Sequence, residues 1–279
     1  MEGERKGLIG IEVIEQSLDF AGCSVYSRRD VANVDAPWLV FSNSLMTDHT
    51  IWDRQVAHFG GRYNILRYDQ RGHGRSDAPT SVSFDELSDD VLALLEDFEI
   101  ERCVYVGLSM GVPTGLALAG KAPDRLAGMV LVDGQAATQP SGRQTWQGRI
   151  DFARANGMAA VAEDTVQRWF AKEFVSSGGA DALRDTASAM RLEGYCACAT
   201  ALQGYDFSAE ARAVAAPVLL LAGANDGAMP VSMRALAETI DDSRFLEIAN
   251  AGHIPNLEQP EQFNAALDHF LQTFDLKTS

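Results

Sequence analysis

Residues 103–111, CVYVGLSMG, join a short apolar run to a serine that has glycines two positions away on either side. The run Val104-Tyr105-Val106 is typical of a buried β-strand, and the segment after Gly111 is rich in glycine and alanine and has a helical pattern. A strand, a Gly-x-Ser-x-Gly turn and a helix in this order predict a nucleophile elbow with Ser109 at its tip. The dipole of the following helix places positive partial charge near that serine. We therefore expect Ser109 to be a nucleophile.

A serine hydroxyl needs a base to remove its proton, so one histidine must reach Ser109. The chain offers His49, His58, His73, His253 and His269. His253 lies in a loop between an expected strand and the last helix, where a parallel sheet presents its reactive groups. His58 and His269 fall within helical patterns, and His73 lies in a loop that we interpret as structural. The base is therefore predicted to be His253.

The base in turn needs a carboxylate that fixes its tautomer and stabilises the imidazolium. Asp226 follows the expected strand Pro217–Leu221, and Asp133, which follows the expected strand Met129–Val132, is the alternative. We prefer Asp226 because its loop should adjoin that of His253. The chain order serine, aspartate, histidine also agrees with a nucleophile elbow of this type.

The negative oxygen that forms during acyl transfer needs two backbone amides. One is expected to be the N–H of Met110, directly after the nucleophile. The second should come from the loop Ser42-Asn43-Ser44-Leu45, in which Leu45 is the first candidate by position and Ser44 the second. A simple polar turn is the alternative interpretation of this loop.

The rest of the chain alternates short apolar runs with amphipathic stretches, as βα units around a sheet do. Strand-like runs are Leu18–Tyr26 (a strand or hairpin arm), Trp38–Ser42, Tyr63–Tyr68, Cys103–Val106, Met129–Val132, Pro217–Leu221 and Phe245–Ile248. From about Gln135 to Arg212 the pattern is helical without a clear strand. We predict an α/β fold whose mostly parallel central sheet, flanked by helices, is formed by residues 1–134 and 213–279. Residues 135–212 are predicted to form a helical lid inserted after the sixth strand.

The charge of the chain restricts its partners. The formal net charge is −16 and no basic cluster is present, so nucleic acids and anionic membranes are not expected to bind. Residues 1–10 lack an apolar run of the secretory type, and no later stretch is long enough to span a bilayer. The four cysteines (Cys23, Cys103, Cys196 and Cys198) suggest reduced thiols rather than disulfides or a zinc site. We expect a cytoplasmic monomer or small homo-oligomer without a metal or an organic cofactor.

Together, these segments resemble the α/β-hydrolase superfamily over nearly the whole chain. The resemblance rests on the elbow, on Tyr68–Ser76 (YDQRGHGRS), and on the Asp226 and His253 loops. Within the superfamily the chain is most similar to 3-oxoadipate enol-lactonases of aromatic-compound catabolism. That similarity is carried by FSNSL at 41–45, TWQGRI at 145–150, GMAAV at 157–161 with RWF at 168–170, and EGYCA at 193–197. Met46 and Val112-Pro113 depart from the pattern, because smaller residues are usual there.

The resemblance implies a substrate that is a small enol-lactone with a free carboxylate, cleaved through an acyl-enzyme. In so acidic a chain the substrate carboxylate needs a nearby cation. We expect Arg149 to supply it, with Trp146 packing on the ring of the substrate. A solvated helix face is the alternative for Arg149.

Other functions are compatible with the same residues. A general carboxylesterase, or a carbon–carbon bond hydrolase of a ring-cleavage pathway, would use the same triad. A ligand-sensing receptor of this superfamily is an alternative of another class, and rapid multiple turnover would argue against it. A scaffold without chemistry is disfavoured because Ser109, Asp226, His253 and the glycines around the serine are all present.

Overall fold

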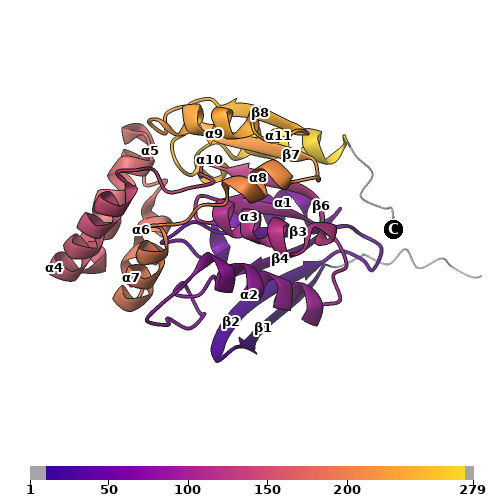
Figure 1. Cartoon of the computed structure of the whole chain (residues 1–279), viewed down its shortest axis with the longest axis horizontal. Helices are drawn as coiled ribbons and strands as arrows, with labels where there is room; N and C mark the ends of the chain where they lie inside the picture. The colour runs from indigo at the N-terminus through magenta and orange to yellow at the C-terminus, as the bar shows by residue number, and fades with distance from the viewer. Residues whose placement is uncertain (1–10, 274–279) are drawn as a thin grey trace, which may run out of the picture.

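The computed structural model describes residues 11–273, so the N-terminal segment 1–10 discussed above lies outside the described residues. One eight-stranded sheet runs through the molecule in the order β1-β2-β4-β3-β5-β6-β7-β8 (Figure 1). Its strands are β1 Glu12–Phe20, β2 Cys23–Val31, β3 Trp38–Ser42, β4 Asn64–Tyr68, β5 Cys103–Leu108, β6 Leu126–Val132, β7 Val218–Gly223 and β8 Ser243–Ile248. Strand β2 is antiparallel to β1 and β4, and all the other pairings are parallel. The predicted mostly parallel sheet is confirmed.

The first two strands form a hairpin whose position differs from the expectation. The apolar run Leu18–Tyr26 was expected to be one strand or hairpin arm, but the turn falls within it, at Ala21-Gly22. Both turn residues have positive φ angles of 51° and 77°. Only the glycine signals such a turn in the sequence, and apolar residues continue on both sides of it, so the run alone did not reveal the break.

Helices cover both faces of the sheet, so its central strands are buried on both sides. On β5, Cys103 and Tyr105 pack into one core with helices α2 (Phe84–Asp97), α3 (Gly111–Lys121), α8 (Ser208–Ala213) and α9 (Met229–Ala237). Val104 and Val106 point to the other face, whose core includes residues of α1 (Asp53–Phe59) and α11 (Pro260–Leu271). This alternation follows from the two-residue period of a strand. It explains why β5 is a continuous apolar run.

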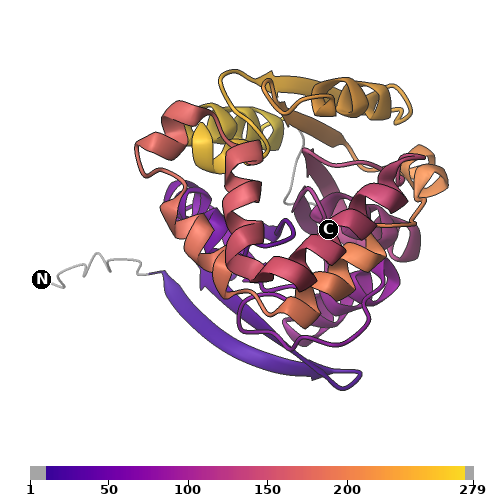
Figure 2. The ribbon, with the colours of Figure 1, turned by 90° about the vertical axis from the view of Figure 1, so that its left-hand side faces the viewer.

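The segment between β6 and β7 is helical, as predicted. It contains α4 (Gly142–Trp169), α5 (Lys172–Ser176), α6 (Asp181–Ala189) and α7 (Leu192–Ala201), followed by α8. Helix α4 is broken at Gly157, where φ is 78° and ψ is 168°, so it consists of two arms that meet at this glycine. Helices α4 to α7 stand at one end of the sheet and face the viewer in Figure 2, whereas α8 packs beside α3. Residues 135–212 remain our proposed extent of the lid.

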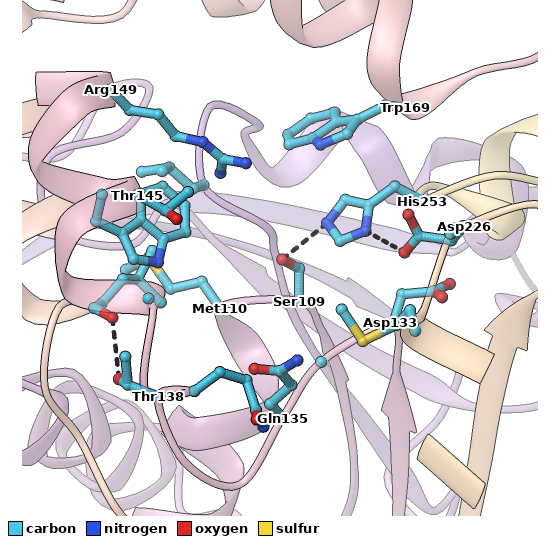
Figure 3. Close-up of a pocket in the computed structure, with 18 of the residues that line it drawn as sticks. Ser109, Met110, Asp133, Gln135, Thr138, Thr145, Arg149, Trp169, Asp226 and His253 are labelled. Atoms are coloured by element: carbon cyan, nitrogen blue, oxygen red, sulfur yellow. Dashed lines mark hydrogen bonds and ion pairs between the residues drawn. The ribbon is translucent and has the colours of Figure 1, made fainter. Parts of the chain in front are cut away.

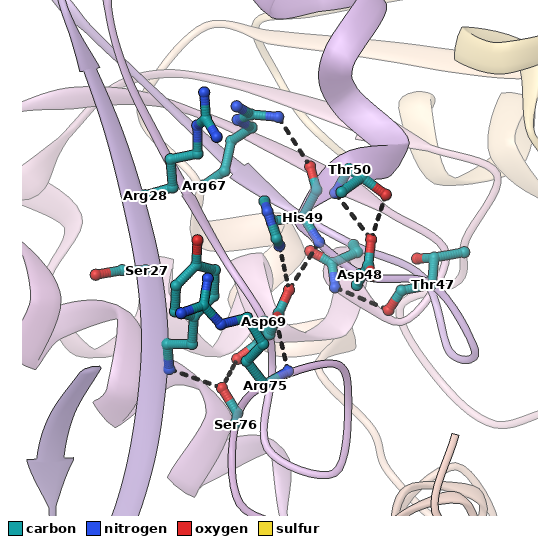
Figure 4. A network of polar contacts seen from close by, with 12 residues as sticks. Ser27, Arg28, Thr47, Asp48, His49, Thr50, Arg67, Asp69, Arg75 and Ser76 are labelled. Carbon is teal, nitrogen blue, oxygen red and sulfur yellow. Dashed lines mark hydrogen bonds and ion pairs between the residues drawn. The ribbon is translucent and has the colours of Figure 1, made fainter. Parts of the chain in front are cut away.

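The loop after β4 fastens this helical layer to the sheet. Arg191, at the start of α7, donates to the carbonyl of Ser76, and the Cys198 thiol donates to the carbonyl of Arg71 at 3.4 Å. Within the loop, Asp69 accepts from the backbone N–H groups of His49 and Arg75, each at 2.8 Å (Figure 4). The loop is therefore held by buried hydrogen bonds at both ends, which supports its structural interpretation.

None of the helices that the structure describes is both long and apolar enough to cross a bilayer.

Candidate active site

Ser109 lies directly after β5 in a left-handed conformation, with φ of 54°. Its N–H donates to the carbonyl of Val132 at 2.7 Å, and its carbonyl accepts from the N–H of Val112 at 2.9 Å. A Cβ at Gly107 would lie 2.4 Å from the carbonyl oxygen of Gly111, and one at Gly111 would lie 2.7 Å from that of Ser42. Both glycines are therefore required by close backbone approach, as expected for a nucleophile elbow.

His253 lies between the serine and an aspartate (Figure 3). Its Nε2 is 2.9 Å from Oγ of Ser109, and its Nδ1 is 2.7 Å from Oδ2 of Asp226. A proton on Nδ1 can be donated to the carboxylate, which leaves Nε2 free to accept the proton of the serine hydroxyl. Burial works to raise the pKa of Asp226, but the charge and hydrogen bond of His253, with a hydrogen bond from Asp133, hold that pKa below its usual value. The three predicted residues thus meet from three separate loops.

The other four histidines have different surroundings. His49 Nδ1 lies 2.8 Å from Asp69, and His73 Nδ1 lies 3.1 Å from the carbonyl of Arg71, where burial lowers the pKa of the His73 ring. His58, on α1, bonds Asp268 of α11, and His269 lies on α11 itself. None of the four is among the residues that line the pocket next to Ser109.

The loop that carries His253 is tied to the end of α4. The N–H of His253 donates to the carbonyl of Trp169 at 2.8 Å. One carboxylate oxygen of Glu258, at the end of α10 (Pro255–Glu258), accepts from the N–H of Gly252 at 2.7 Å, and the other accepts from that of Ala171 at 3.0 Å. The sequence interpretation did not identify Glu258, because these partners are brought together only by the folded lid.

Asp133, the alternative acid, does not contact His253 through a hydrogen bond in the described part of the chain. Its oxygens both lie 3.1 Å from the N–H of Gly223, at the end of β7. Burial, and then the charge of Asp226, raise the pKa of Asp133 well above its usual value. The geometry favours Asp226 as the partner of the imidazole.

The candidate oxyanion residues Leu45 and Met110 line the same pocket as Ser109, whereas Ser44 does not. The N–H groups of Leu45 and Met110 donate to no other group within residues 11–273, so both are free for a bound oxygen. The carbonyl of Ser44 instead accepts from the Thr47 hydroxyl at 2.9 Å and so helps to close the turn. This arrangement supports the first choice, Leu45, over the second.

The surroundings of Met46 explain why this larger residue departs from the family pattern. It has a φ of 68°, which lies in the left-handed region where glycine is favoured. Met46 is buried, with only 2% of its surface exposed, and its sulfur accepts from the Thr165 hydroxyl of α4 at 3.7 Å. The side chain therefore links the oxyanion loop to the lid at the cost of a strained backbone.

The pocket has a volume of about 410 Å³ and lies between the sheet and α4. Trp146, Arg149, Arg168 and Trp169 of α4 line it together with the Ser109 triad. The guanidinium of Arg149 lies 4.5 Å from the centre of the Trp146 ring and points into the pocket in Figure 3. Arg168 is paired with Asp164 at 3.0 Å, but Arg149 has no carboxylate partner among the described residues. Burial, with the neighbouring charge of Arg168, lowers the pKa of Arg149, yet a guanidinium stays charged at neutral pH.

Two groups of side chains in the described region could geometrically hold a metal ion. They are Asp48 with His49 and Asp69, and Asp133 with Asp226 and His253. In the second group both ring nitrogens of His253 are already hydrogen bonded, to Asp226 and to Ser109. The second group therefore fits a hydrogen-bonded triad better than a metal site, because neither ring nitrogen of His253 is left over for an ion.

The chain is similar in sequence and in structure to known hydrolases. The family model described as alpha/beta hydrolase fold matches residues 37–260. The chain is 35% identical over 253 residues to 3-oxoadipate enol-lactonase 2 of Acinetobacter baylyi, covering 86% of this chain and 91% of the relative. It is 32% identical to 3-oxoadipate enol-lactonase 1 of the same organism, covering 86% and 90%. The crystal structure of the enol-lactonase from Burkholderia xenovorans LB400 superimposes with a TM-score of 0.86 at 34% identity, covering 92% of this chain and 100% of that one.

Proposed function

Because this chain belongs to the alpha/beta hydrolase family, we propose that it is a serine hydrolase that cleaves a small carboxylated lactone or ester through an acyl-enzyme. The substrate that the relatives support best is 3-oxoadipate enol-lactone, an intermediate of aromatic-compound catabolism. The cytoplasmic location and the monomeric or small homo-oligomeric state expected from the sequence stay predictions.

The first half of the reaction forms the acyl-enzyme. Nε2 of His253 takes the proton of Ser109 while Oγ attacks the lactone carbonyl carbon, and Asp226 stabilises the imidazolium. The bond between the carbonyl carbon and the ring oxygen then breaks. The ring oxygen leaves as an enol and takes the proton from His253. An enol is a better leaving group than an alkoxide, so little further acid catalysis is needed.

The second half returns the enzyme to its starting state. His253 takes a proton from a water molecule, whose oxygen attacks the acyl carbon. The bond to Oγ breaks, and Ser109 recovers its proton from the imidazolium as the new carboxylic acid leaves and ionises in water. In both halves the N–H groups of Met110 and Leu45 stabilise the negative oxygen, since neither has another acceptor among residues 11–273.

The carboxylate of the substrate is assigned to Arg149. The observation that carries this proposal is the half-buried guanidinium of Arg149, which has no carboxylate partner in the described chain and lines the same pocket as the Ser109–His253 pair. A cation held in this way favours an anionic ligand, with which it forms two parallel hydrogen bonds. Trp146, on which the guanidinium lies, packs on the ring of the substrate.

A matched panel of substrates tests the proposal. The purified protein should hydrolyse carboxylated enol-lactones with many turnovers and with a higher kcat/KM than neutral lactones and esters of equal size. Equal rates on charged and neutral substrates would instead favour a general carboxylesterase. Activity confined to carbon–carbon bond cleavage of a ring-fission diketone would favour a carbon–carbon bond hydrolase. Tight binding without turnover would indicate a ligand-sensing protein.

A further inference from the structure

Asp133 is a buried carboxyl group that none of these steps uses, and it lies beside one that they do use. It follows β6 directly and is fully buried. Oxygens of Asp133 and Asp226 and a ring nitrogen of His253 lie within 4.8 Å of one another. Figure 3 shows Asp133 next to Asp226, on the side of the triad away from Trp169. Two carboxyl groups, Asp133 buried and Asp226 half-buried, thus lie next to a single imidazole.

The surroundings of Asp133 do not favour a negative charge. Its hydrogen-bond donor in the described chain is the N–H of Gly223, which the two oxygens share at 3.1 Å. No ion pair joins Asp133 to a lysine, arginine or histidine within residues 11–273, whereas Asp226 is paired with His253. A buried carboxyl group and a neighbouring half-buried one that share a single cationic partner cannot both ionise at low cost. The carboxyl group without the partner therefore keeps its proton.

We propose that Asp133 is a positioning residue that remains protonated and donates its O–H to the carboxylate of Asp226. One oxygen of Asp133 then carries the proton, and the other accepts from the N–H of Gly223. Asp226 receives two donors, the O–H of Asp133 and the Nδ1–H of His253. This role rests on the proposed function, because it takes Asp226 to be the triad acid.

The second hydrogen bond has a consequence for the base. A carboxylate that accepts from Asp133 has less negative charge to offer the imidazolium that forms when Ser109 gives up its proton. Loss of the donor at position 133 is therefore expected to change the pH dependence of the serine reaction.

Three other charged groups approach the triad. Arg149 and Arg168 line the pocket from α4, and the charge of Arg168 contributes to the lowered pKa of Asp226. Glu258 accepts from the N–H groups of Gly252 and Ala171. In the described chain none of the three forms an ion pair with Asp133 or Asp226, so a change at Asp133 is expected to act through Asp226.

Thermal unfolding of the Asp133→Asn variant tests the protonation state without any substrate. An asparagine can accept from Gly223 and donate to Asp226 as a protonated aspartic acid does. The wild-type protein must hold a proton that the unfolded chain releases once the pH exceeds about 4, so its stability falls as the pH rises toward the raised pKa of Asp133. The variant lacks this loss. Its Tm should therefore rise relative to wild type by about 3 °C per pH unit from pH 5 upward, until the pH reaches the raised pKa of Asp133. Asp241→Asn, which removes one exposed carboxylate, is the control.

The pH dependence of Ser109 labelling tests the hydrogen bond to Asp226. The probe is a small fluorophosphonate, whose reaction rate with the serine does not depend on the natural substrate. Asp133→Asn should keep the acid-side midpoint of the wild-type profile. Asp133→Leu, which has a similar shape but no donor, should move the midpoint upward by about half to one pH unit.

Two results would overturn the proposal. A Tm difference for Asp133→Asn that does not grow with pH would mean that Asp133 is ionised. A downward shift of the labelling midpoint in Asp133→Asn would mean the same, because the variant would then have lost a negative charge next to His253. If the fluorophosphonate does not label wild type at all, the serine mechanism fails, and the unfolding series still decides the state of Asp133.

Discussion

The backbone N–H of His253 donates to the carbonyl of Trp169 at 2.8 Å, so the proposed base is attached to the last turn of the lid helix α4. The Trp169 ring also lies 4.9 Å from the imidazole, centre to centre, with the planes inclined at 36°. The position of the base therefore depends on the helical insertion as well as on the sheet. The contacts of Glu258 complete this attachment.

Glu258→Ala is expected to destabilise the attachment. It removes the acceptor of two backbone donors, at Gly252 and Ala171, one of which is buried. An unsatisfied buried donor costs about 1–3 kcal/mol, so the free energy of unfolding should fall by about 2–4 kcal/mol. Glu258→Gln keeps one acceptor oxygen and should lose less. Urea denaturation measures both variants, and an equal loss in the two would show that the hydrogen bonds do not set the effect.

Ser109→Ala should remain folded and lose hydrolysis by about 10⁴-fold or more, since no other group can form the acyl-enzyme. A fluorophosphonate should add once per chain to wild type and not to the variant, as measured by intact mass. Labelling of another residue, or wild-type turnover in the variant, would show that Ser109 is not the nucleophile.

Asp226→Asn should reduce kcat by about 10⁴-fold while leaving Ser109 in place, because the amide favours the wrong imidazole tautomer. The measurement is steady-state turnover beside that of Asp133→Asn. If the Asp133 variant lost more activity, the roles assigned to the two carboxyl groups would have to be exchanged.

The strain at Met46 predicts an unusual order of stability. Met46→Ala loses the buried side chain but keeps a left-handed backbone that costs about 1–2 kcal/mol, whereas Met46→Gly loses the side chain and relieves that cost. The glycine variant should therefore be the more stable of the two, although glycine usually lowers stability relative to alanine. Urea denaturation in parallel gives the order, and the reverse order would argue against strain at this position.

Local patterns explain which features could be predicted from the sequence. Ser109, Asp226 and His253 each follow a strand-like run, and the carboxyl ends of parallel strands meet at one edge of the sheet. The contacts of Glu258 could not be predicted, because Ala171 is 87 residues away and no periodic pattern relates the two. The hairpin turn at Ala21-Gly22 was missed for a different reason: the apolar run continues through the turn, so its pattern shows no break.

Arg149 gives the sharpest test of substrate choice. If it binds the substrate carboxylate, Arg149→Ala should lower kcat/KM for carboxylated lactones by an amount equivalent to about 1.5–3 kcal/mol, the range for a charge-assisted hydrogen bond. A neutral ester of similar size should scarcely be affected. Arg149→Lys should recover only part of the loss, because an ammonium cannot form two parallel hydrogen bonds.

The control for Arg149 is Arg154→Ala, which removes the same charge from an exposed position of α4 outside the pocket lining. It should leave both kinds of substrate unchanged, because a cation in solvent is screened from the pocket. An equal loss on charged and neutral substrates in Arg149→Ala would identify Arg149 as packing of the lid. A loss of similar size in Arg154→Ala would point to the overall charge of the lid instead. Only a loss that is specific to Arg149 and to carboxylated substrates supports the enol-lactonase proposal, since the triad alone acts on either kind of ester.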